Sequence, residues 1–154
     1  MVDLLKISRP ARLTSPTTHL IGYANDLQYT DLIVKAAKET DPLKRMKLVS
    51  AFILGGLHVM PTKCKSKAPL NPVLGETYQA HKKDGCKIFL EQTSHHPPTS
   101  NFFMHGPEKS FEIIGFAETV AKMTGLNSIK GWREGKSIIK FKDGTLMTWL
   151  CPEM

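Results

Sequence analysis

The chain has 154 residues, 41% hydrophobic and 23% charged, a composition that excludes disorder and fits one globular domain. The formal net charge of +7 favours acidic partners, namely nucleic acid, anionic lipid surfaces or phosphorylated ligands. Three cysteines without CxxC spacing indicate neither a disulfide framework nor a zinc knuckle, and favour a reducing, cytosolic setting.

The N-terminal third is expected to be helical after an extended arm over residues 1–15. A short helix that carries Leu20 and Ile21 can be capped by Thr17 or Thr18. A second helix is predicted over residues 29–39. Residues 49–60 form the longest apolar patch, but it is too short to span a bilayer, so we expect any membrane contact to be peripheral.

The clearest helix begins at Asp41 and Pro42, because aspartate is a good N-cap and proline suits the first helical position. Apolar residues then recur at spacings of three and four, which predicts that one stripe faces the core. The stripe consists of Leu43, Met46, Val49, Ile53 and Leu57, and Phe52 widens it.

The remainder of the chain has the pattern of β-strands. After a basic loop at 61–69, we predict strands at 77–82, 86–93, 99–105, 111–123, 137–142 and 145–150. Asp84-Gly85 and Asp143-Gly144 are two-residue hairpin signals. About five or six short strands joined by turns indicate an antiparallel meander. The fold class is therefore α+β, mainly β, with N-terminal helices ahead of the meander.

One segment could carry chemistry: Ser94-His95-His96-Pro97-Pro98. The prolines fix φ and donate no hydrogen bond, so they should end the preceding strand and present the histidines at its tip. Neighbouring side chains in an extended chain point to opposite faces, unless the turn brings the rings together. Two imidazoles can donate hydrogen bonds to phosphate oxygens.

Three other interpretations of this segment stand beside that one. A metal site would have to draw on scattered residues such as His58, Cys64, Cys86 and His105, so no metal site is expected. A hydrolase would need a nucleophile on a sharp turn, but no GxSxG occurs, so neither catalytic residues nor a cofactor are expected. The third interpretation is a polar turn whose histidines are solvated and have no binding or catalytic role.

The eight residues from Glu91 to Pro98, EQTSHHPP, match at every position the signature of the oxysterol-binding protein family, E-Q-[VT]-S-H-H-P-P. Residues 69–78, PLNPVLGETY, also resemble the family, and residues 41–49 resemble more loosely its helix ahead of the barrel. From about residue 8 onward, the chain resembles the N-terminal part of that family's lipid-binding domain.

The resemblance implies part of a large, incomplete β-barrel around an apolar tunnel. Residues 1–28 would be a lid or arm, 29–60 helices and 69–154 barrel strands. The tandem histidines His95 and His96 would bind the phosphate of a phosphoinositide headgroup, and three further residues would join them: Lys67, Leu70 and Asn71. The lid would include Leu13, Leu20 and Ile21. Trp132, Trp149, Phe102 and Phe103 would be wall or interface aromatics.

Two departures from the family pattern qualify this expectation. The family commonly has a lysine immediately before the Pro-(Leu/Phe)-Asn-Pro segment, where this chain has Ala68, with Lys67 one residue earlier. A shift of one residue turns a side chain to the other face of an extended segment. The family's domain is also much longer, and five or six strands cannot close its barrel, so strand edges would be left open for another chain.

Three functions follow as hypotheses. The first is a cytoplasmic lipid carrier, peripherally associated with anionic intracellular membranes, which moves a sterol or phosphoinositide between them. The second is a truncated, non-transferring interaction module that binds membranes or a full-length relative. The third, a nucleic-acid binder, rests on the charge alone and is not expected, because the basic residues form no helix stripe and do not alternate with aromatics.

Overall fold

The computed structural model describes residues 10–57, 67–123 and 129–150. The elements in chain order are η2 (Ala11–Leu13), β1 (Thr14–Thr18), α1 (His19–Asp26), α2 (Thr30–Lys38), α3 (Pro42–Leu57), β2 (Ala68–Leu70), β3 (Thr77–His81), β4 (Lys87–His95), β5 (Pro98–His105), η3 (Pro107–Lys109), β6 (Phe111–Met123), β7 (Ile129–Glu134), β8 (Lys136–Phe141) and β9 (Leu146–Leu150). The predictions that concern His58, Cys64 and residues 61–66 lie outside the described residues.

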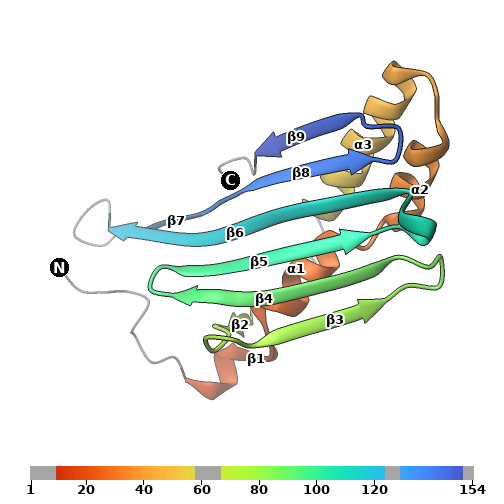
Figure 1. The fold of residues 1–154 in the computed structure, drawn as a ribbon. Coiled ribbons are helices and arrows are strands. Elements are labelled where there is room, and N and C mark those ends of the chain that lie inside the picture. Colours follow the sequence, from red (N-terminus) through yellow and green to blue (C-terminus); the bar gives the residue numbers. More distant parts are fainter. Residues whose placement is uncertain (1–9, 58–66, 124–128, 151–154) are drawn as a thin grey trace.

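Seven strands form one antiparallel sheet, in the order β3-β4-β5-β6-β8-β9 with β7 also paired to β6 (Figure 1). Residues 111–115 of β6 pair with β8, and residues 118–123 pair with β7. β3 and β9 end the strand order and do not pair with each other, so the described strands do not close into a barrel. This arrangement confirms the predicted meander and its incomplete closure.

The three helices lie on one face of this sheet (Figure 1). Along β8, buried and exposed residues alternate strictly, as expected for a sheet with one covered face. The core between the two layers draws on all three helices and on the inward residues of the central strands; its fully buried large side chains include Leu20, Ile33, Phe52, Ile88, Met104, Phe111, Ile113, Ile139 and Phe141. The opposite face exposes Ile114 and Ile138.

Two Lys-Asp-Gly turns connect the outer strand pairs, but each loop has three residues and not the predicted two. Phe141 N donates to Thr145 O, and Asp143 Oδ1 accepts a hydrogen bond from Thr145 N. Gly144 has φ 88° and Gly85, in the other turn, has φ 86°. Only glycine adopts this left-handed region freely, and a three-residue hairpin loop requires it at its last position.

Three strands were not predicted. β1 lies within the predicted arm and pairs in parallel with β2, Thr14 opposite Ala68 and Thr18 opposite Leu70. β2 therefore occupies the end of the predicted basic loop. β7 was missed because its residues, IKGWRE, show no apolar alternation. The helix α1 begins after Thr18 as predicted, but without a side-chain cap hydrogen bond.

The predicted buried stripe of α3 is wrong for its first two residues, Leu43 and Met46, whereas Val49 and Phe52 are buried as predicted. Asp41 does cap the helix, since its Oδ1 accepts hydrogen bonds from Leu43 N at 2.9 Å and Lys44 N at 3.3 Å. The face that packs inward, however, consists of Arg45, Val49, Phe52 and Gly56. Ile53 and Leu57 are half-buried, whereas Leu43 and Met46 point outward.

Gly56 explains the orientation of α3. A Cβ at this position would lie 2.1 Å from the carbonyl oxygen of Asp26, so only glycine lets the end of α3 approach the end of α1 this closely. The opposite end of α3 is held inward by Arg45, whose side chain reaches the β8–β9 turn. These two contacts decide which face is buried, although apolar residues also occupy the other face.

Candidate functional site

The histidine pair lies at the tip of the β4–β5 hairpin. β4 ends at His95, β5 begins at Pro98, and these two residues are opposite each other in the register. His96 and Pro97, joined by a cis peptide bond, form the connection. The ring centroids of His95 and His96 are 4.8 Å apart, with the ring planes at 70°. The turn therefore brings the two rings together instead of directing them to opposite faces.

Hydrogen bonds from Asn101 and Thr99, and not from the imidazoles, stabilise the hairpin tip. Asn101 Nδ2 donates to Thr93 Oγ1 at 2.6 Å, and Thr99 Oγ1 donates to Pro97 O at 3.3 Å. His95 is half-buried, and its Nδ1 is buried without a hydrogen-bond partner among the described residues. His96 is exposed. A buried polar atom without a partner is unfavourable, so this turn is suited to an incoming hydrogen-bonding ligand.

The segment that follows Leu70 and Asn71 lies beside the same strand. Gly75 N donates to Gln92 O at 2.8 Å, and Gln92 N donates to Glu76 O at 2.9 Å. These bonds extend β4's pairing to within three residues of His95. Leu70 is 45% exposed and Asn71 is exposed, so both side chains are available to a ligand.

Lys67 and the residues predicted for the lid lie elsewhere in the fold. Lys67 is exposed immediately before β2, whose strand pairing ties it to the N-terminal arm. Of the residues predicted for the lid, Leu13 is 49% exposed and Ile21 is half-buried, whereas Leu20 is fully buried in the core. Leu20 therefore anchors α1 to the sheet.

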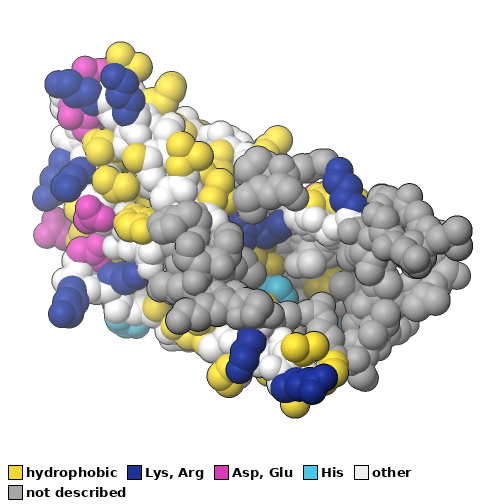
Figure 2. All heavy atoms as spheres, turned by 180° about the vertical axis from the view of Figure 1, so that it is seen from behind, with side chains coloured by type: hydrophobic (Ala, Val, Ile, Leu, Met, Phe, Trp, Pro, Cys, Tyr) yellow, Lys and Arg dark blue, Asp and Glu magenta, His cyan; other side chains and the backbone are white. Residues whose placement is uncertain are grey.

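A small cavity of about 60 Å³ lies between the helices and the sheet. Its wall is mainly apolar and includes Leu27, Phe52, Phe102 and Trp149. This volume accommodates only a few water molecules. This cavity is therefore too small to hold a lipid, and its residues form one wall of an apolar site. From behind, the helix side is hollowed, with basic, histidine and hydrophobic side chains visible within the hollow (Figure 2).

An ion pair that sequence reasoning missed lines this cavity. Arg133 Nη1, on β7, lies 2.5 Å from Asp26 Oδ2, at the end of α1, and the two side chains are 20% and 15% exposed. The guanidinium also lies over the Tyr23 ring, 5.3 Å from its centroid. Burial raises the pKa of Asp26, and Arg133 opposes that rise. No local pattern could reveal the pair, because its members are far apart in the sequence.

The described residues supply little for nucleophilic or metal chemistry. They contain no group of three or more His, Cys, Asp or Glu side chains that could hold a metal ion. Burial raises the pKa of the Cys86 thiol to about 12, so this cysteine carries no thiolate near neutral pH. None of the helices in the described ranges has the length and apolar character needed to cross a bilayer.

The described residues thus form an open antiparallel sheet with helices on one face and a histidine turn at one end. The sequence matches the family profile described as "Oxysterol-binding protein" over residues 2–154, and the chain belongs to this family. It is 35% identical to oxysterol-binding protein 9 of Dictyostelium discoideum, over 99% of this chain and 35% of that protein. It is 43% identical to human oxysterol-binding protein-related protein 6, over 64% of this chain and 10% of that protein.

Solved structures agree with this assignment. The Osh3 ORD of Saccharomyces cerevisiae in complex with PI(4)P has a TM-score of 0.84 and 30% identity, over 97% of this chain and 40% of that one. The Osh1 ORD in complex with ergosterol has a TM-score of 0.80 and 26% identity, over 96% and 35%. The chain spans about a third of the length of the curated relatives that it matches nearly end to end.

Proposed function

We propose that this chain is the N-terminal part of a lipid-binding domain whose ligand is a sterol or a phosphoinositide. The histidine turn binds the phosphorylated headgroup, and the helix-facing side of the sheet forms one wall of the site for the apolar part of the lipid. The observation that carries the proposal is the contact between His95 and His96, with the buried Nδ1 of His95 left without a partner among the described residues. The solved complexes of two relatives, one with PI(4)P and one with ergosterol, support this ligand class.

The other predicted residues have supporting roles in this proposal. Asn71 and Leu70 contribute to the headgroup site from the segment beside β4. Lys67 supplies the cation, since its long flexible stem compensates for the one-residue displacement from Ala68. Leu13 and Ile21 belong to a lid over the bound lipid, hinged on the buried Leu20.

In the cell, the domain acts in the cytoplasm, associates peripherally with anionic intracellular membranes and moves lipid between them. Completion of the lipid site requires further walls, because the described sheet is open along β3 and β9. The proposal therefore includes additional strands, from the same protein or from another chain, alongside one of these edges.

Lipid extraction from vesicles tests the proposal. The full chain is incubated with vesicles that carry labelled phosphoinositide or labelled sterol, and the label in the soluble fraction is measured. His95→Ala/His96→Ala should abolish phosphoinositide uptake and leave sterol uptake unchanged. His81→Ala, which removes an exposed histidine from β3, is the control and should leave both unchanged. Absence of both lipids from soluble, monodisperse wild-type protein would overturn lipid binding by this chain.

The exposed apolar side chains of the sheet favour a second candidate, an interaction module that binds a full-length relative without carrying lipid. Ile114 is 59% exposed and Phe116 is 39% exposed on a central strand of the sheet. Native mass spectrometry after co-expression with such a relative separates the two functions. A stable complex supports the module, whereas a lipid-loaded monomer without any complex excludes it.

A further inference from the structure

The outward face of α3 is unusually apolar for a helix surface. Leu43, Met46 and Leu54 are 59%, 56% and 67% exposed. Because 3.6 residues make one turn, these three residues lie along a single stripe opposite the buried face of the helix. Ser50, also exposed, lies on the same stripe. The stripe runs nearly the whole length of the 16-residue helix.

The charges beside this stripe have a single sign. Lys44 and Lys47 are exposed, and the helix contains no aspartate or glutamate. The two carboxylates just before the helix accept hydrogen bonds from backbone N–H groups: Asp41 from Leu43 and Lys44, and Glu39 from Thr40 and Asp41. Figure 2 shows hydrophobic and basic side chains, with acidic ones beside them, exposed together at the end of the molecule where α3 begins.

This chemistry distinguishes between possible occupants. The centre of a protein–protein interface is depleted in lysine, since a desolvated ammonium without a partner is unfavourable. At a lipid surface, by contrast, lysine stems lie along the apolar region while their ammonium groups reach the phosphates. A helix that combines an apolar face with lysines and lacks acidic residues therefore fits the interface of an anionic bilayer.

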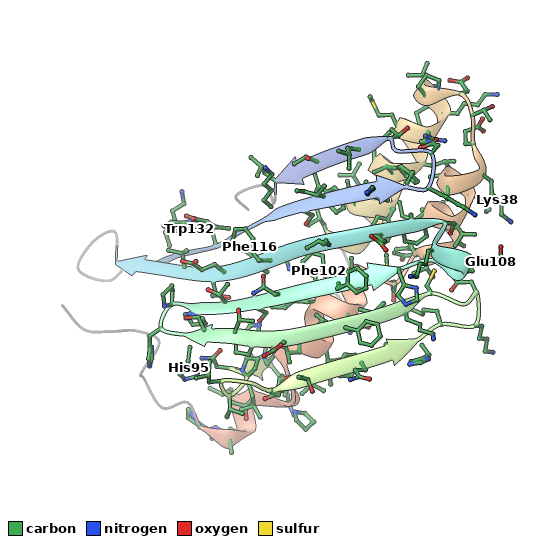
Figure 3. All side chains as sticks on the ribbon, viewed as in Figure 1. Lys38, His95, Phe102, Glu108, Phe116 and Trp132 are labelled. Carbon is green, nitrogen blue, oxygen red and sulfur yellow. The ribbon has the colours of Figure 1, made fainter. Side chains whose placement is uncertain are left out.

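We propose that the outward face of α3, formed by Leu43, Met46, Lys44, Lys47 and Leu54, docks this chain onto an anionic lipid bilayer. This surface is separate from the histidine turn. Lys38, four residues before α3, lies at the end of the molecule opposite His95 (Figure 3). Docking through α3 thus needs no phosphoinositide and does not depend on headgroup recognition.

Sedimentation of the full chain with vesicles tests this proposal. The vesicles contain phosphatidylcholine with or without phosphatidylserine, and neither phosphoinositide nor sterol, so that the histidine turn has no ligand. Wild-type protein should bind the phosphatidylserine vesicles more tightly, and added salt should weaken that binding. Lys44→Glu/Lys47→Glu should weaken it at least about thirty-fold, since each lysine near an anionic surface contributes roughly fivefold.

A second variant, Leu43→Ser/Met46→Ser/Leu54→Ser, should weaken binding to a similar degree while the fold, followed by circular dichroism, stays intact. The matched controls are Lys83→Glu/Lys87→Glu, at two exposed lysines in and beside the β3–β4 turn, and Leu146→Ser, at an exposed leucine of β9. These controls should bind as the wild type does. Equal loss in the controls, unchanged binding by the α3 variants, or a change confined to oligomeric state would each overturn the proposal.

Discussion

Arg45 Nη1 lies 2.7 Å from Asp143 Oδ2, and this ion pair fastens the start of α3 to the β8–β9 turn. The same guanidinium donates to Thr145 Oγ1 and to Glu39 O, and it lies 4.9 Å from the centroid of the Phe141 ring. The Arg45 side chain is only 9% exposed, although that of Asp143 is 49% exposed. Arg45 therefore joins the helical layer to the far end of the sheet.

Arg45→Met should lower the free energy of unfolding by about 1–3 kcal/mol, the range for leaving buried polar groups without a hydrogen-bond partner. The loss arises because the carbonyl oxygen of Glu39 and the hydroxyl of Thr145 lose their donor, while the new side chain still fills the space. Urea denaturation followed by circular dichroism measures it. Lys44→Met, one position along on the exposed side, is the control and should change stability by less than about 0.5 kcal/mol. Equal stability of the two variants would contradict the role of Arg45.

Asp143 should make the stability of the domain sensitive to acid. Hydrogen bonds from the backbone and side chain of Thr145, and then Arg45, lower the pKa of this carboxyl below 3.8. An acid whose pKa is lower in the folded state stabilises the fold above its unfolded pKa and loses that contribution as pH falls through its folded pKa. Asp143→Asn should thus be less stable than wild type near neutral pH, and the two curves should converge below about pH 3.8. Urea midpoints measured from neutral pH downward test this; a constant difference across the range would contradict it.

The ion pair between Asp26 and Arg133 should show strong energetic coupling. Asp26→Leu alone removes the carboxylate that faces a largely buried guanidinium, so it should lower the free energy of unfolding. Because both side chains are partly exposed, the loss should not exceed the low end of the range for buried ion pairs, about 3 kcal/mol. Arg133→Leu should have a comparable effect. The double variant should lose less than the sum of the two, because an apolar pair suits this apolar cavity. A double-mutant cycle by urea denaturation measures the coupling, and simple additivity would show that the pair is not coupled.

Local patterns predicted much of this architecture. The strand at 111–123 has the predicted bounds, because a rough alternation of apolar and polar residues favours an extended strand there. The cap at Asp41 and the two Asp-Gly turns depend on adjacent residues, so the sequence contains the necessary information. The histidine turn was recognised from eight consecutive residues, although the contact between the two rings required the geometry of the turn.

What sequence reasoning missed depends on contacts between distant residues. Apolar residues nearly surround α3, so periodicity could not decide which face packs inward; Gly56 against Asp26 and Arg45 against Asp143 decide it. β7 forms a strand through its pairing with β6, because its own residues have no strand pattern. The cavity pair Asp26 and Arg133 meets only when α1 and β7 come together.

The close approach of α3 to α1 gives the last prediction. Gly56→Ala would place a Cβ 2.1 Å from the carbonyl oxygen of Asp26, and backbone cannot move aside as a flexible side chain can. The two helices must separate, which should cost about 1–3 kcal/mol and disturb the nearby Asp26–Arg133 pair. Gly131→Ala is the matched control, since the nearest atom to its new Cβ is 3.7 Å away. Thermal and urea unfolding should show a large loss for Gly56→Ala and little change for Gly131→Ala. Equal unfolding midpoints for Gly56→Ala and wild type would mean that the end of α3 does not contact α1 in solution.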